Sequence, residues 1–111
     1  MNHEYTNNST NPVYIKVVII EPILQACIDG SSFTEVYLSV QRVIPSSELV
    51  LREYIFYLLN SSFISYNGIK KKYVIEPFGL DLLEIIYVQA ERRVVEYSDL
   101  TLKIELFCQS S

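Results

Sequence analysis

The chain has few of the residues on which small enzymes and metal-binding domains depend. Of its 111 residues, one is His, two are Cys and three are Gly. His3 stands in a polar N-terminal segment. There is no glycine-rich phosphate loop, and no Ser, Cys or Thr is set beside a candidate base. The sequence therefore predicts no catalytic residue, no metal site and no cofactor, and we do not expect an enzyme.

The two cysteines and the apolar runs also fit no secreted or membrane class. Cys27 and Cys108 are far apart and form no CxxC motif, so reduced, buried thiols are expected rather than a disulfide or a metal site. The N-terminal residues lack the basic and apolar regions of a signal peptide. No apolar run approaches the ~20 residues that span a bilayer. We expect a cytoplasmic protein without a membrane segment.

The chain has few positively charged residues: it contains 9 Lys and Arg but 13 Asp and Glu, which gives a net charge of −4. Nucleic-acid binding would therefore have to come from a local basic patch. Half of the residues are hydrophobic, and the length suits one domain. The predicted organisation is a flexible arm over residues 1–11, a folded domain over 12–98 and a C-terminal extension over 99–111.

The beginning of the folded domain carries two patterns. Asn11 and Pro12 fit the N-cap and first position of a helix, whereas the apolar residues from Val13 to Ile19 alternate as in a strand. From residue 20 onward the apolar spacing is helical. Either a helix kinks at Pro22, or a strand is followed by a helix that begins at residue 21, and Gly30 ends the helix in both cases.

Two further helices have clear start signals. Ser32 and Glu35 form a capping-box pattern that predicts a helix over 33–41. Ser46 or Ser47 can cap a third helix, whose apolar stripe is formed by Leu51, Tyr54, Ile55, Leu58 and Leu59. The residues expected to face outward from this third helix are Ser47, Glu48, Val50, Glu53 and Tyr57, with Arg52 as its only cation.

A hairpin and a long helix are predicted next. Strands over 63–66 and 70–75 flank Asn67-Gly68, a strong hairpin signal, and Glu76-Pro77 ends the sheet. A helix from residue 78 carries an apolar seam of Leu83, Ile86, Ala90, Val94 and Tyr97. This seam either joins two copies as a homodimer, which we favour, or packs on the first helix of the same chain. Tyr54, Tyr73 and Tyr87 are expected to face the core. Residues 99–107 fit both a strand and a continued helix, and we favour a break near residue 98.

The order of helix, hairpin with a basic tip and helix is that of a winged helix-turn-helix. The predicted fold is therefore mainly α with a small β wing and a long C-terminal helix. The residues expected to contact DNA are Ser46, Ser47, Arg52, Lys70, Lys71 and Lys72, with the lysines reaching phosphates. The alternative is a winged-helix module that binds a protein and no DNA, because Glu48 and Glu53 face outward on the third helix.

About sixty residues of the chain also carry a patterned family resemblance. The matching segments are Ile23-Leu24, Asp29-Gly30, Thr34, Leu51-Arg52-Glu53-Tyr54-Ile55-Phe56-Tyr57-Leu58, Ser62-Phe63-Ile64 and Glu76-Pro77-Phe78-Gly79-Leu80-Asp81-Leu82-Leu83. They resemble a family of archaeal winged-helix proteins regarded as transcriptional regulators. The resemblance implies a cytoplasmic homodimer that binds double-stranded DNA in transcription regulation or chromatin and associates through its last helix. Family recognition helices usually carry several lysines, where this chain has Glu48, Val50 and Glu53.

Overall fold

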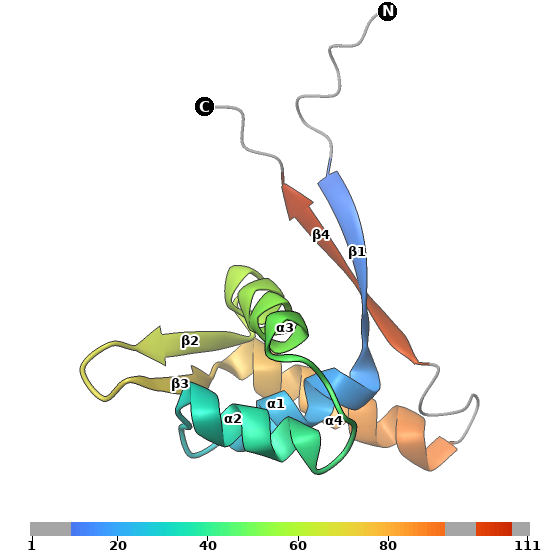
Figure 1. Cartoon of the computed structure of the whole chain (residues 1–111). Helices are drawn as coiled ribbons and strands as arrows, with labels where there is room; N and C mark the ends of the chain where they lie inside the picture. The colour runs from blue at the N-terminus through green and yellow to red at the C-terminus, as the bar shows by residue number, and fades with distance from the viewer. Residues whose placement is uncertain (1–9, 93–99, 108–111) are drawn as a thin grey trace, which may run out of the picture.

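The computed structural model describes residues 10–92 and 100–107. The elements in order are β1 (Thr10–Lys16), α1 (Val17–Cys27), α2 (Phe33–Gln41), α3 (Glu48–Asn60), β2 (Ile64–Asn67), β3 (Lys72–Ile75), α4 (Pro77–Arg92) and β4 (Thr101–Phe107). Four helices and two small antiparallel sheets make up the described part of the chain, which is mainly α. Figure 1 shows the helices gathered in one body, from which the β2–β3 hairpin and the β1–β4 ribbon project in different directions.

The first and last described strands pair with each other. The register runs from Thr10 opposite Phe107 to Lys16 opposite Thr101. Two predictions need correction here, because Pro12 lies inside β1 rather than at a helix start, and residues 10 and 11 belong to this strand rather than to an arm. The predicted C-terminal extension is a strand that pairs with the N-terminal one, which decides between strand and helix for residues 101–107.

The β1–β4 ribbon is fixed to the helices at its lower end. Ile15 and Ile104 are buried in the core, and they lie on the same face of the ribbon because Ile104 is opposite Val13. The Lys16 N–H donates a hydrogen bond to the Tyr54 hydroxyl at 2.9 Å. The Val17 N–H donates to the carbonyl of Leu100 at 3.0 Å, so the end of the ribbon leads directly into α1.

Helix α1 is the centre of the core, because its residues are buried nearly all round. Its buried residues are Val17, Ile19, Ile20, Pro22, Ile23, Leu24 and Cys27. The helix begins five residues before Pro22, so a strand followed by a helix is the correct alternative, but the changeover comes at residue 17 rather than at residue 21. Burial of this helix outweighs the loss of the N–H that Pro22 cannot donate. Gly30 follows the helix with φ 88°, a left-handed conformation that glycine adopts without strain.

Helices α2 and α3 have the predicted positions and caps. The Ser32 hydroxyl accepts from the Glu35 N–H at 3.2 Å, and the Glu35 carboxylate accepts from the Ser32 N–H at 2.9 Å, which completes the capping box. The Ser47 hydroxyl caps α3 by accepting from the Val50 N–H at 3.1 Å. These caps depend on residues within three positions of each other, which explains why the sequence was sufficient to locate them.

The β2–β3 hairpin has a longer turn than predicted. Asn67 pairs with Lys72, so four residues form the loop and β3 begins at residue 72 rather than at residue 70. The Asn67 side-chain oxygen accepts from the backbone N–H groups of Ile69 and Lys70 at 3.0 and 3.1 Å, and Lys71 has φ 57°. Asn67 therefore starts an Asx turn, which replaces the two-residue Asn-Gly turn.

Helix α4 packs against α1, and this changes the interpretation of its apolar seam. Leu82, Leu83 and Ile86 are buried in the core of the same chain. Leu83 and Ile86 are consequently unavailable to a second copy. For these two residues, the alternative that the seam packs on the first helix of the same chain is correct. Ala90 is exposed, and Val94 and Tyr97 lie outside the described residues. Tyr87 was expected in the core but is 43% exposed.

None of the helices in the described segments combines the length and the hydropathy that crossing a membrane requires.

Candidate nucleic-acid interface

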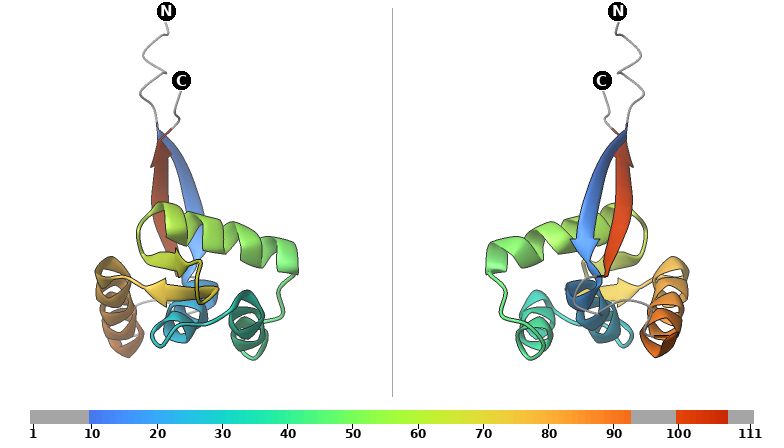
Figure 2. Two further views of the ribbon diagram at one scale, coloured as in Figure 1. Left: turned by 90° about the vertical axis from the view of Figure 1, so that its left-hand side faces the viewer. Right: turned by 90° about the vertical axis from the view of Figure 1, so that its right-hand side faces the viewer.

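The residues predicted to contact DNA come from two neighbouring parts of the body, α3 with its preceding turn and the β2–β3 hairpin. The left panel of Figure 2 views this side directly. The hairpin points at the viewer below α3, and α2 lies below α3 to the right of the hairpin. A pair of backbone hydrogen bonds ties the hairpin to the segment before α2. The Ser31 N–H donates to the Tyr73 carbonyl at 3.0 Å, and the Tyr73 N–H donates to the Ser31 carbonyl at 2.7 Å.

The tip of the hairpin presents two lysines to solvent. Lys70 and Lys71 are exposed, and neither forms an ion pair within the described part of the chain. Between Gly68 and these lysines stands Ile69, which is 94% exposed. The Asx turn orders the backbone around Lys70, so both lysines are carried at the end of the hairpin.

Lys72 is different from its two neighbours, since it lies in β3 and is half-buried. Its charge acts on Glu35 at the start of α2. The pKa of the Glu35 carboxyl is lowered, first by the hydrogen bond from the Ser32 backbone N–H and to a smaller degree by the positive charge of Lys72. Part of the field of Lys72 is thus already balanced within the chain.

Arg52 on α3 is also engaged. Its Nη2 lies 2.7 Å and its Nε 3.0 Å from the same Glu48 oxygen, in an ion pair whose two side chains are each more than half exposed. The guanidinium carbon lies 4.2 Å from the centre of the Phe33 ring, which is a cation–π geometry. A phosphate that approached Arg52 would have to compete with Glu48 for this charge.

Ser46 and Ser47 hold the turn between α2 and α3. The Ser47 hydroxyl caps α3, and the Ser46 hydroxyl donates to the Ile44 carbonyl at 3.3 Å. The Ser46 N–H donates to the Gln41 side-chain oxygen at 3.3 Å, and the Gln41 amide nitrogen donates back to the Ser46 carbonyl. Both serines thus stabilise the turn and the start of α3, and these hydrogen bonds explain their presence without a ligand.

The outward face of α3 is more apolar than the sequence indicated. Leu49 is 68% and Phe56 55% exposed, whereas Val50 and Tyr57, which were expected outside, are half-buried. Leu49 and Phe56 are seven residues apart and share a face with Arg52 and Glu53. From the sequence, Leu49 and Phe56 were placed neither in the apolar stripe nor on the outward face. Their spacing relative to Leu51, Ile55 and Leu58 was the signal that could have found them.

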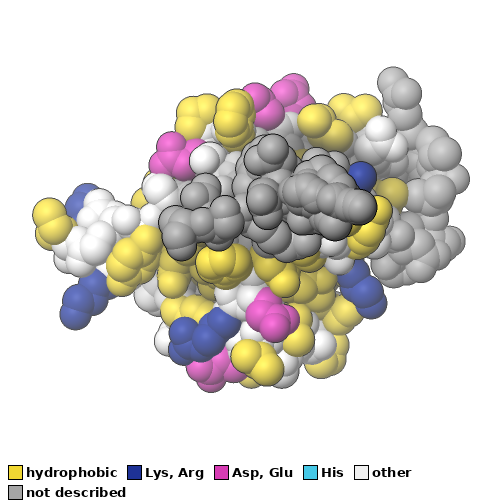
Figure 3. Space-filling view, turned by 90° about the horizontal axis from the view of Figure 1, so that it is seen from above, with side chains coloured by type: hydrophobic (Ala, Val, Ile, Leu, Met, Phe, Trp, Pro, Cys, Tyr) yellow, Lys and Arg dark blue, Asp and Glu magenta, His cyan; other side chains and the backbone are white. Residues whose placement is uncertain are grey.

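On the face seen from above, positive charge does not form one continuous surface. Figure 3 looks down on the molecule from above and shows Lys and Arg side chains apart from one another, with hydrophobic and acidic side chains between them. The β2–β3 hairpin, which carries Lys70, Lys71 and Lys72, projects to the left in this view. The site therefore consists of a lysine-bearing hairpin tip beside a helix whose single arginine is paired with a carboxylate.

The described residues contain no group of three His, Cys, Asp or Glu side chains placed to hold a metal ion. Cys27 is buried at the C-terminal end of α1, where desolvation raises the pKa of its thiol to about 12. Cys108 lies outside the described residues. At neutral pH the thiol of Cys27 is protonated, so it is a packing residue rather than a nucleophile.

No protein-family model matches the chain, and no curated protein matches its sequence.

Proposed function

We propose that the protein is a winged-helix DNA-binding protein of transcription regulation or chromatin, that it acts as a homodimer, and that the β2–β3 hairpin is its wing. The observation that carries the proposal is the pairing of Ser31 with Tyr73. It joins the segment between α1 and α2 to the hairpin, so that the wing is held next to the start of α2. Helix, turn, helix and adjoining wing are the parts of a winged helix-turn-helix.

Phosphate contact is the main source of affinity in this proposal. Lys70 and Lys71 project from the wing tip, and lysine is a flexible point charge suited to phosphate. The exposed face of α3 offers Leu49, Arg52, Glu53 and Phe56, which is a poor set for hydrogen bonding to base edges. We therefore expect duplex binding that depends on the backbone and groove shape and discriminates weakly between sequences.

The homodimer is proposed on the outer face of α4. Leu83 and Ile86 of the predicted seam are buried, but Ile85 and Val88 remain 57% and 40% exposed. A dimer would place two wings on one duplex. Two copies would also double the number of phosphate contacts, which an acidic chain needs more than a basic one does.

The proposal is tested by fluorescence anisotropy with a labelled random duplex at low salt. Replacing Lys70, Lys71 and Lys72 together by Ala removes the wing charges and should raise Kd at least tenfold, because each phosphate contact contributes to a largely electrostatic affinity. Lys16→Ala is the matched control, since Lys16 is an exposed lysine on the β1–β4 ribbon. Equal effects of the wing variant and the control would contradict the assignment of the wing.

A second candidate is a winged-helix module that binds a protein, and the exposure of Leu49 and Phe56 favours it. Partly apolar helix faces commonly enter grooves of partner proteins. In that case the wild-type chain would not bind the duplex at low salt. Replacement of Leu49 and Phe56 by Ser would then abolish capture of a partner, whereas DNA binding through the wing is expected to survive the same replacement.

A further inference from the structure

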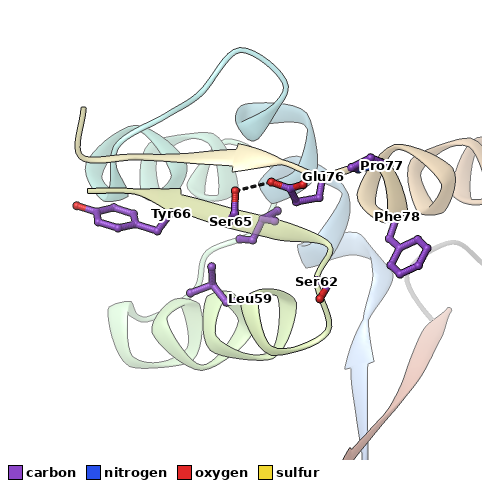
Figure 4. Close-up of a pocket in the computed structure, with 8 residues that line it drawn as sticks. Leu59, Ser62, Ser65, Tyr66, Glu76, Pro77 and Phe78 are labelled. Carbon is purple, nitrogen blue, oxygen red and sulfur yellow. Dashed lines mark hydrogen bonds between the residues drawn. The ribbon is translucent and has the colours of Figure 1, made fainter. Parts of the chain in front are cut away.

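A hollow of about 600 Å³ lies between the C-terminal end of α3, strand β2 and the beginning of α4. Six of the side chains that line it are Leu59, Ile64, Tyr66, Glu76, Pro77 and Phe78. Figure 4 shows Leu59 directed from α3 toward β2, with the rings of Tyr66 and Phe78 at opposite ends of the close-up. The volume lies in the range of small-molecule sites, and the lining is mostly apolar.

One charge belongs to this hollow. Glu76 is its only ionisable carboxylate, and no Lys, Arg or His among the described residues lines it. The Ser65 hydroxyl donates to Glu76 Oε2 at 2.5 Å (Figure 4), so Oε1 retains its capacity to accept. The Glu76 N–H donates to the Phe63 carbonyl at 2.9 Å, which fixes the backbone that carries this carboxylate. An anionic ligand would meet the negative charge without any compensating cation.

The aromatic side chains, like Glu76, favour a positively charged ligand. Tyr66 and Phe78, which line the hollow, are 48% and 63% exposed, so their rings are accessible to solvent. The face of an aromatic ring attracts a cation, and apolar walls such as those of Leu59 and Pro77 favour a hydrophobic body. A carboxylate, two accessible rings and apolar walls together match a ligand that is both cationic and hydrophobic.

We propose that this hollow is a binding site for hydrophobic organic cations. The site is independent of the wing lysines and of α3's outward face, and its test uses no DNA. Its failure would therefore leave the proposed function untouched, and the reverse also holds.

The probe is tetraphenylphosphonium, compared with tetraphenylborate, which has nearly the same size and shape and the opposite charge. Isothermal titration calorimetry should give saturable one-to-one binding of the cation and at least tenfold weaker binding of the borate. Amide resonances of Ser65, Tyr66 and Phe78 should shift in nitrogen–proton correlation spectra on addition of the cation, because these residues line the hollow. Equal binding of both ions, or no binding of the cation, would overturn the proposal.

Variants assign the binding to Glu76. Glu76→Gln removes the negative charge but keeps an oxygen that can accept the hydrogen bond from Ser65. It should therefore weaken binding of the cation about tenfold. Glu53→Gln is the control, because it removes an exposed carboxylate of α3 that does not line the hollow. A cation affinity that is unchanged in Glu76→Gln, or lowered equally in both variants, would also overturn the proposal.

Discussion

Gly79 is the position where a single methyl group should disturb the fold most. It lies in the first turn of α4, and a Cβ added there would stand 2.2 Å from the carbonyl oxygen of Phe63 and 2.7 Å from Cγ1 of Ile75. A relaxed carbon–oxygen contact is about 3.3 Å or longer, so α4 or the start of β2 would have to move by about 1 Å. The Phe63 carbonyl cannot move freely, because it accepts the Glu76 N–H at 2.9 Å.

Whether Gly79→Ala stabilises or destabilises the fold depends on the balance between helix propensity and the steric cost of the added methyl group. Ala is preferred over Gly in a helix by about 1 kcal/mol. Overpacking costs about 1–3 kcal/mol, and loss of the Phe63–Glu76 hydrogen bond adds about 1–3 kcal/mol. We therefore expect Gly79→Ala to lower the free energy of unfolding by about 3 kcal/mol, or Tm by about 12 °C at roughly 4 °C per kcal/mol.

Far-UV circular dichroism with thermal and urea denaturation measures this difference. Gly68→Ala is the matched control, because a Cβ at this exposed hairpin position meets nothing within 4 Å. The control should change the free energy of unfolding by less than about 1 kcal/mol. If Gly79→Ala proves as stable as the wild type, helix propensity outweighs the contact and the close approach of α4 to residue 63 is wrong.

Three further predictions concern titration, the buried thiol and assembly. The pKa of Glu35 is lowered in the folded state, so its contribution is present above the unfolded pKa of about 4.3 and is lost as pH falls through the folded value; Glu35→Gln should flatten the acid side of the stability profile, and an unchanged slope would contradict this. In a Cys108→Ser variant, Cys27 should react with a disulfide reagent at pH 8 only after denaturant is added, because its thiol pKa is about 12; rapid labelling of the native protein would refute its burial. Replacing Ile85 and Val88 by Glu should convert the proposed homodimer to a monomer in light scattering without loss of helix content, whereas an unchanged mass would exclude this face as the interface.

Local signals explain which parts of the fold could be predicted. The capping box of Ser32 and Glu35 and the cap at Ser47 gave the starts of α2 and α3, since both depend on residues three apart. The ribbon could not be predicted in the same way, because Val13 and Ile104 are opposite each other but 91 positions apart in the sequence. Pro12 has a signal that fits a helix start, and only pairing with β4 overrides it.

The sequence indicates where the residues of the candidate site lie in the fold, but it does not indicate which of their charges are balanced by neighbours. The lysines at the hairpin follow from Asn67-Gly68 and the basic run after it. The contacts that balance the charges of Arg52 and Lys72 do not follow from the sequence pattern. Arg52 contacts Glu48 and Phe33, and the charge of Lys72 acts on Glu35. Buried positions on α4 were also misassigned, because a seam of Leu83 and Ile86 has the same spacing whether it packs on α1 or on a second chain.

The central claim is that a local basic wing binds duplex DNA in spite of the acidic net charge. The most direct test is the anisotropy of a labelled random duplex titrated with the wild-type chain over a series of salt concentrations. With the three wing lysines neutralising phosphates, the logarithm of the binding constant should fall against the logarithm of salt concentration with a slope of roughly −2 to −3 per chain. Absence of binding at the lowest salt, or binding that salt does not weaken, would contradict the claim.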